Sequence, residues 1–162
     1  MKATDIEIAV VNYFDCRRCL IVPNISWAMF RYEMDLIVVR PSGYATEIEI
    51  KISISDLRAD QKKWHGHRND RIKNLYFAIP KTLLAKALPL IPEEAGILTV
   101  EAYDDGTVSV RCEVERQAKD RNKYKFNDRE MLTIAKNAAI KLWSAKHKIR
   151  ELKQKGGQSE NQ

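Results

Sequence analysis

The sequence predicts an α/β (α+β) fold in which a mixed β-sheet is flanked by helices, followed by a long basic amphipathic helix. Short runs of apolar and β-branched residues, typical of strands, alternate along the chain with segments of helical periodicity. The C-terminal part carries a seven-residue apolar repeat and most of the positive charge. With 162 residues and 44% hydrophobic content, the chain can bury one sizeable core.

The N-terminal third predicts a helix, a strand and a β-hairpin. The helix is expected over residues 4–14, and the strand over residues 20–30 with an interruption near Pro23-Asn24. The apolar stripe of the helix consists of Ile6, Ala9, Val10 and Tyr13. The hairpin spans residues 34–53, because an apolar run at 36–39 is followed by turn residues and then by strict alternation over 47–54. The alternation places Ile48, Ile50, Ile52 and Ile54 on one side, and Glu47, Glu49, Lys51 and Ser53 on the other.

The turn sets the register of this hairpin. If Pro41-Ser42-Gly43 forms a three-residue loop with Gly43 in the left-handed conformation, Arg40 pairs with Tyr44. Counting back puts Asp35 opposite Glu49, Ile37 opposite Glu47, and Glu33 opposite Lys51. Neighbouring strands lie about 4.8 Å apart, so two facing carboxylates can bind one hard cation at roughly 2.1 to 2.5 Å.

Asp35, Glu49 and Lys51 together match the needs of metal-assisted phosphodiester hydrolysis. The acids would bind the ion, and the lysine would orient and help to deprotonate the attacking water. Glu-x-Lys also occurs at residues 151–153, so the tripeptide alone is not diagnostic. The alternative is an ordinary solvated strand face lined by Glu and Lys.

The middle of the chain predicts the rest of the sheet. Ser53 and Asp56 are expected to cap a helix that ends near His65 and Gly66. A buried strand follows at residues 75–79, then a short helix at 82–88. A second hairpin is expected from strands at 96–102 and 107–112, joined by a turn at 104–106.

The helix after the hairpin and its following loop are basic and polar. Because this helix leaves directly from the strand that carries Glu49, its exposed side should flank a bound phosphate, with Gln61 and Lys62 as the first contacts. The wider set of expected nucleic-acid contacts is Arg58, Gln61, Lys62, Lys63, His67 and Arg68. A plain solvated face is the alternative.

Asp35, then Glu49-Ile50-Lys51, then a helix that opens at Ser53 resemble the restriction-endonuclease-like PD-(D/E)xK nuclease core. More narrowly, the chain resembles the MmcB-like DNA-repair nucleases. That likeness rests on residues 48–53, Asp56, Lys63-Trp64, residues 76–80 and residues 91–98. It covers about residues 5 to 112 and not the C-terminal segment. Met34 replaces the proline of the superfamily name, which supplies no ligand.

The resemblance implies a metal-dependent nuclease that hydrolyses phosphodiester bonds in DNA during repair. Asp35, Glu49 and the Ile50 carbonyl would hold Mg²⁺ or Mn²⁺, while Lys51 orients the water. Glu7 on the first helix would reach the metal, or else is a solvated first-turn acid. Glu47 and Glu33 are additional candidate ligands. No base-reading element is visible, which favours structure-selective or nonspecific cutting; a non-cleaving DNA-binding accessory protein and an RNA-directed nuclease are the alternatives.

The positive charge is concentrated near the C-terminal end. The net charge is +6, but residues 116–155 hold 13 Lys or Arg against 4 Asp or Glu, a local +9. We therefore expect a nuclease core at 1–115, a basic linker and helix at 116–155, and a disordered tail at 156–162.

The C-terminal helix is expected from a capping box of Asn127 and Glu130 to about Lys155. Its heptad seam consists of Met131, Ala135, Ala138, Leu142, Ala145, Ile149 and Leu152. The helix could fold back on the domain with a basic outer face, form a homodimer or bind a partner protein through residues 131–152, or grip DNA.

No apolar run has the length of a signal sequence or a membrane span, so we expect a cytoplasmic protein without membrane contact. Three cysteines make no disulfide framework. Cys16 and Cys19 have zinc spacing but lack a second close pair, so we expect reduced thiols and no zinc.

Overall fold

The structure, a computed structural model, describes residues 1–162 except 27–29, 31, 64–65, 105–107 and 160–162. The far end of the expected first strand, the expected helix end at His65 and most of the second hairpin turn thus lie outside the described residues. The elements are α1 (Ala3–Phe14), β1 (Leu20–Ile25), β2 (Met34–Val39), β3 (Ala45–Ile50), α2 (Ile54–Asp60), β4 (Asn74–Pro80), α3 (Leu84–Ala87) with a short 3₁₀ turn on each side, β5 (Gly96–Asp104), β6 (Val108–Arg116) and α4 (Asp128–Ser159).

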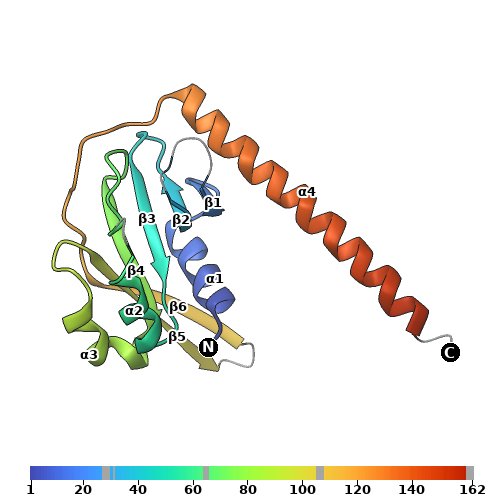
Figure 1. Ribbon diagram of the computed structural model, residues 1–162, viewed down its shortest axis with the longest axis horizontal. Helices are drawn as coiled ribbons and strands as arrows, with labels where there is room; N and C mark the ends of the chain where they lie inside the picture. The colour runs from blue at the N-terminus through green and yellow to red at the C-terminus, as the bar shows by residue number, and fades with distance from the viewer. Residues whose placement is uncertain (27–29, 31, 64–65, 105–107, 160–162) are drawn as a thin grey trace.

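The predicted mixed sheet flanked by helices is confirmed. Within the described residues, six strands form one sheet in the order β1-β2-β3-β4-β5-β6. The central strands β3, β4 and β5 are parallel, and the outer pairs are antiparallel. Helix α1 packs on one face of the sheet, and α2 and α3 pack on the other (Figure 1). Because both faces are covered, β4 is a nearly continuous apolar run.

The predicted hairpin register is confirmed by the pairing of β2 with β3. Ile37 lies opposite Glu47 and Val39 opposite Ala45. In the turn, the Arg40 amide donates to the Tyr44 carbonyl at 2.9 Å, and Gly43 has a φ of +83°. Extending this register by one pair puts Asp35 beside Glu49.

Two expected element lengths were wrong. Strand β3 ends at Ile50 instead of continuing to Ile54. The Lys51 amide makes the last ladder bond, to the Ala78 carbonyl of β4, and the chain then turns into α2. Ser53 caps α2 as predicted by accepting a hydrogen bond from the Asp56 amide at 3.1 Å. Helix α2 ends at Asp60, and the Lys62 and Lys63 amides bond three residues back, as in a 3₁₀ turn. Tyr13 of the expected α1 stripe is also largely exposed, while Ile6, Ala9 and Val10 are buried.

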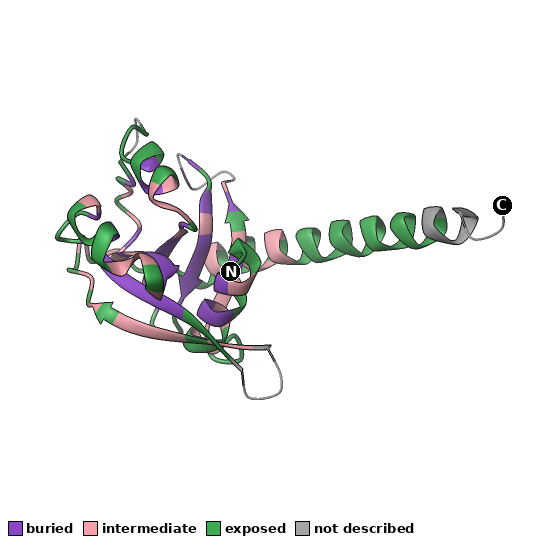
Figure 2. Ribbon diagram, turned by 90° about the horizontal axis from the view of Figure 1, so that it is seen from below, coloured by how far each residue is buried: buried purple, intermediate pink, exposed green. Residues whose placement is uncertain are grey.

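Helix α4 begins as predicted, with reciprocal hydrogen bonds between Asn127 and Glu130, and it continues to Ser159. Of the three alternatives for this helix, folding back on the domain is the one that the structure contradicts. Ile134 is buried, and Met131 and Ala138 are partly buried against the core formed by β1 and β2. Every described side chain from 139 to 154 is exposed, and the helix projects away from the domain (Figures 1 and 2). Packing against the core therefore fixes the first turns of the helix, and the remaining turns extend into solvent.

No helix in the described part of the chain combines the length and the apolar composition that crossing a membrane requires.

The Gly43 turn offers a test of the fold. Gly43→Ala forces a side chain into a left-handed backbone and puts a Cβ 2.7 Å from the Phe126 carbonyl oxygen. We expect a loss of about 1 to 3 kcal/mol in the free energy of unfolding, measured by urea denaturation. Gly66→Ala is the matched control, because Gly66 has a φ of +49° but no atom within 4 Å of the new Cβ. Equal losses in the two variants would contradict a role for the Phe126 contact.

Candidate functional site

The face of β3 that carries Glu47, Glu49 and Lys51 is buried. Their exposed fractions are 0%, 1% and 4%, so the alternative of an ordinary solvated face is wrong. Helix α2 and the loop after it cover this face and bring two further ionisable side chains, Asp60 and His67, into contact with it. Charged groups are rarely buried unless they are paired, which makes this cluster the most unusual part of the domain.

Lys51 lies at the centre of the buried cluster. Its Nζ is 2.7 Å from Glu49 Oε2, 2.8 Å from Asp60 Oδ1 and 4.0 Å from Asp35 Oδ2. Burial alone would lower the pKa of Lys51, but the charge of Glu49 and the hydrogen bonds to Asp60 and Glu49 raise it above its ordinary value. Lys51 is therefore a fixed ammonium group that points toward the carboxylates of β2 and β3.

Asp60 was missed by the sequence prediction. Its carboxylate joins three cations: Lys51, Lys63 at 2.6 Å and His67 Nε2 at 2.7 Å. Burial opposes ionisation, but the hydrogen bonds from these cations lower the pKa of Asp60 well below its usual range. One signal was available in the sequence, because Asp60 lies three residues after Leu57, on the side of α2 that packs against the sheet.

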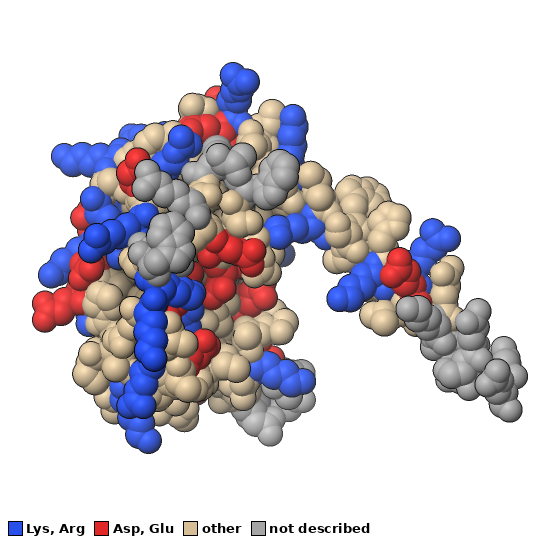
Figure 3. Space-filling view, in the orientation of Figure 1, with Lys and Arg blue, Asp and Glu red and all other residues tan. Residues whose placement is uncertain are grey.

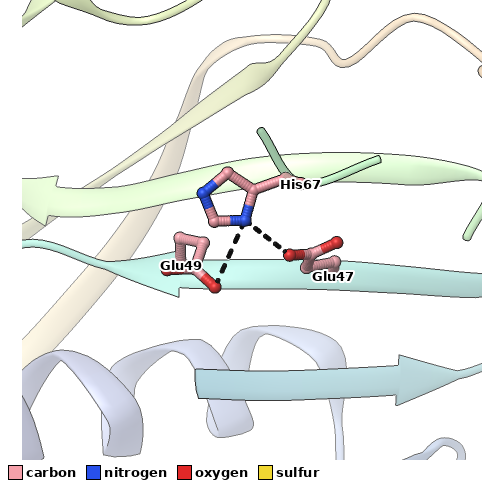
Figure 4. A group of neighbouring side chains, drawn as sticks. All are labelled: Glu47, Glu49 and His67. Atoms are coloured by element: carbon pink, nitrogen blue, oxygen red, sulfur yellow. Dashed lines mark hydrogen bonds and ion pairs between the residues drawn. The ribbon is translucent and has the colours of Figure 1, made fainter. Parts of the chain in front are cut away.

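His67 joins β3 to α2. Its Nδ1 lies 2.8 Å from Glu47 Oε1 and 3.6 Å from Glu49 Oε1, as Figure 4 shows, and its Nε2 hydrogen-bonds Asp60. Burial lowers the pKa of His67, but the hydrogen bonds to Asp60 and Glu47 raise it to about 9. With both ring nitrogens bonded to carboxylates, His67 is placed to hold the site together and is poorly placed to meet a phosphate.

The backbone and neighbours of His67 fix this position. Its φ of +54° is a left-handed conformation that residues other than glycine rarely adopt. The rings of Tyr32 and Phe77 pack edge-on against the imidazole, and the Tyr32 hydroxyl donates to Glu47 Oε2 at 2.7 Å. The buried Glu47 carboxylate thus has partners from two other parts of the chain, Tyr32 and His67.

Asp35 is at the open side of the cluster. Its Oδ2 accepts a hydrogen bond from the Ile50 amide at 2.8 Å, and its side chain is 39% exposed. Burial and the charge of Glu49 raise the pKa of Asp35, and burial together with the charge of Asp35 raises the pKa of Glu7 on α1. The structure therefore brings Glu7, Asp35 and Glu49 together, while Glu33 is exposed before β2 begins.

The residues present fit a divalent cation. Among the described residues the cluster gathers five acids, Glu7, Asp35, Glu47, Glu49 and Asp60, against three cations, Lys51, Lys63 and His67. Glu49 Oε1 is buried, and no described group donates a hydrogen bond to it. A buried carboxylate oxygen without a donor, next to a second carboxylate of like charge, is a position that a cation would stabilise.

Two ligand sets are available to such a cation. Ligand atoms of Glu47, Glu49 and His67 lie within 4.8 Å of one another (Figure 4). That set requires His67 to lose a proton and its hydrogen bond to Glu47, which the raised pKa opposes. The Asp35 and Glu49 set consists of oxygen atoms only and reaches solvent on its Asp35 side, which suits Mg²⁺ or Mn²⁺ better.

The expected nucleic-acid contacts fall into three groups. Gln61 donates to the Leu90 carbonyl at 2.9 Å and so packs against the turn after α3. Arg58 and Lys62 are exposed. Lys63 and Arg68 line an open cleft of about 1070 Å³ beside the buried cluster, together with Lys119 and Arg121 from the segment after β6. Three acids, Asp70, Glu94 and Asp120, line the same cleft, so its basic residues outnumber its acids by one. In the space-filling view, lysine and arginine side chains surround a smaller acidic area (Figure 3).

The fold and the buried acid-lysine cluster define an α+β domain with a candidate cation site at the end of β3. The family model for DNA repair protein MmcB-like matches residues 1–149, and the chain belongs to this family. The match extends through most of α4, so the expectation that the likeness stops near residue 112 was wrong. Membership indicates a role in DNA repair.

A solved structure of a protein of unknown function from Silicibacter pomeroyi is similar to the chain, with a TM-score of 0.64 and 19% identity. The alignment covers 93% of this chain and 92% of that one, and at this identity it shows the shared fold alone. The search of curated proteins found no match.

His67 should make the stability depend on pH. Its folded pKa of about 9 is above the ordinary 6.5, so its contribution is complete below about pH 6.5 and is lost as the pH rises through 9. Between these pH values, the free energy of unfolding of the wild-type protein in EDTA should fall by up to about 3 kcal/mol more than that of His67→Gln. Urea denaturation measures both. His147→Gln, which changes an exposed histidine of α4, should keep the wild-type slope. Parallel pH profiles for wild type and His67→Gln would show that His67 is not charged in the cluster.

Proposed function

We propose that this protein is a Mg²⁺- or Mn²⁺-dependent nuclease that hydrolyses phosphodiester bonds in DNA. The observation that supports this most directly is the partly exposed Asp35 beside Glu49, whose buried Oε1 has no described donor, with the Lys51 ammonium between them and Asp60. A partly exposed carboxylate beside a buried one, backed by a fixed cation, is suited to binding a metal and a phosphate at one point.

Asp35, Glu49 and the Ile50 carbonyl would hold the metal, with Glu7 near enough to take part through a water molecule. When bound, the metal would supply Lewis-acid activation of the phosphate and of a water nucleophile. Lys51 would orient the water and stabilise negative charge on the phosphate. As an ammonium group it has no lone pair, so it cannot accept the proton of the water while it stays charged.

Asp60, His67 and Glu47 act as positioning residues. Asp60 holds Lys51 at 2.8 Å, and His67 fixes Asp60 and Glu47 to each other across the interface of α2 and β3. The lysine therefore has its orientation set before substrate arrives, which avoids reorganisation during the reaction. The cleft lined by Lys63, Arg68, Lys119 and Arg121 would bind the phosphate backbone beside the cut site.

These phosphate contacts carry no sequence information, so we infer structure-selective or nonspecific cutting. Arg58 and Lys62, which are exposed at the end of α2 and just after it, would extend the contact with the DNA backbone. The cytoplasmic location stays a prediction.

Cleavage of supercoiled, linear, single-stranded and branched DNA, each with Mg²⁺, Mn²⁺ or EDTA, tests the activity. Asp35→Asn removes one negative charge but keeps an oxygen for the Ile50 amide, so the fold should survive. We expect it to cut at least about a hundredfold more slowly, because the metal contributes several kcal/mol to the transition state. Glu33→Gln is the matched control, since it neutralises an exposed acid two residues away, and it should cut normally. Equal rates in both variants would remove Asp35 from the site.

Metal binding can be measured without activity. With Mn²⁺ at about 100 times its dissociation constant, we expect the free energy of unfolding of wild type to rise by about 2.7 kcal/mol. The rise should vanish in Asp35→Asn and persist in Glu33→Gln and Glu47→Gln. A rise that survives Asp35→Asn but is lost in Glu47→Gln would instead place the ion at Glu47, Glu49 and His67.

A DNA-binding accessory protein that does not cut is the second candidate. It is favoured by the close pairing of Lys51 with Glu49 and Asp60, because such a network can exist for stability alone. DNA binding without cleavage, unchanged by Asp35→Asn, would support it. Competition between DNA and RNA of the same sequence separates the remaining alternative, an RNA-directed nuclease.

A further inference from the structure

The distal half of α4, residues 139–154, is exposed throughout, and only Ile140 and Lys141 at its start still line a pocket with Asn24 and Ile25 of β1. Leu142, Ile149 and Leu152 are 55%, 52% and 61% exposed. Figure 2 shows this part as an exposed helix that extends away from the domain. Isolated helices of this length are marginally stable in water, and most helices in proteins depend on packing of an apolar face.

The exposed apolar side chains continue the stripe that anchors the helix. Met131 and Ala138 pack against the domain core beside Ile134, and the same heptad positions continue as Leu142, Ala145, Ile149 and Leu152. The proximal part of the seam therefore has a partner in the domain, and the distal part needs one from elsewhere.

The charges beside this seam identify the partner. The heptad positions that flank the seam carry Lys141, Lys146, Lys148 and Lys153. In a coiled coil these flanking positions face their counterparts on the other helix and decide which partner is accepted. Residues 139–154 contain five Lys or Arg and one acid, Glu151. A second copy of α4 would bring lysines against lysines, whereas an acidic helix would bring carboxylates against them.

The shape of the seam favours a helical partner over a lipid surface or DNA. Lysines border the apolar stripe on both sides, so the stripe itself has the narrow width typical of a coiled coil. Ile140 and Trp143 are also exposed, but they lie outside this stripe. A helix that lies in a membrane interface has a broader apolar face, which sinks below the headgroups. DNA phosphates would pair with the lysines but would leave Leu142, Ile149 and Leu152 in water.

We propose that residues 139–154 of α4 bind an acidic amphipathic helix of another protein as a two-stranded coiled coil. The apolar seam of the partner covers Leu142, Ala145, Ile149 and Leu152, and its glutamates or aspartates pair with the flanking lysines. The site is independent of the proposed nuclease centre, because it uses no residue of the buried cluster.

The first test measures binding of two synthetic helical peptides to the full-length protein by fluorescence anisotropy. Both peptides span about three heptads with Leu and Ile in the seam, and they differ only in flanking positions that are all Glu or all Lys. We expect the Glu peptide to bind and the Lys peptide to bind at least about tenfold more weakly. Failure of the Glu peptide to bind, or equal binding of both peptides, would overturn the proposal.

Three variants localise the contact. The double variant Leu142→Ser with Ile149→Ser should lower the affinity for the Glu peptide by about a hundredfold, because two seam side chains no longer bury apolar surface in the complex. Ile140→Ser is the matched control, since Ile140 is 62% exposed and lies opposite the seam, and it should bind as wild type does. Lys146→Glu with Lys148→Glu should reverse the preference in favour of the Lys peptide. Loss of binding in Ile140→Ser but not in the seam variant would overturn the proposal.

The remaining occupants give distinct results with the same variants. Sedimentation velocity could show a dimer at micromolar concentration that Leu142→Ser with Ile149→Ser abolishes. That result would overturn the proposal and show that the seam binds a second copy of this chain. The protein could instead sediment with phosphatidylglycerol vesicles but not with phosphatidylcholine vesicles, and lose this binding in the seam variant. That result would overturn the proposal and show that the seam binds a membrane surface. A monomer that binds the Glu peptide and neither vesicle confirms the proposal.

Discussion

The burial of Lys51 between Glu49 and Asp60 is the interaction on which the candidate site depends. It ties the end of β3 to α2 and gives one carboxylate of each element a charged partner. Removing a single member would leave an uncompensated charge in the interior, which is strongly destabilising. The cluster therefore acts as one unit, and His67 and Tyr32 extend it by satisfying Glu47.

A buried network of this kind is an uncertain source of stability, since apolar residues of the same volume would often do as well. Its arrangement is better explained by what it presents at the surface. The inner members are paired with one another, whereas Asp35 is partly exposed and Glu49 keeps one oxygen without a described donor. The interior thus orients a small group of ligands at an opening beside a polar cleft that carries four lysine or arginine side chains and three acids.

The protein has two surfaces that carry lysine or arginine side chains but differ in shape. The cleft beside Lys63 and Arg68 is a concave polar surface suited to a phosphate backbone. The distal part of α4 is a narrow apolar seam with lysines along its edges. Both are basic, so net charge alone could not distinguish a surface for nucleic acid from one for a partner helix.

The sequence by itself determined the strand register and the face on which Glu47, Glu49 and Lys51 lie, because a glycine turn and a two-residue alternation are local properties. It also determined where α4 begins, through the capping box of Asn127. Only the tertiary structure joined Asp60 and His67 to the cluster, since the partners of Asp60 and Glu47 come from other parts of the chain, and the helical spacing of Asp60 from Leu57 does not say which groups it meets. It alone decided the direction of α4, because the heptad pattern describes an apolar face and does not say what covers it.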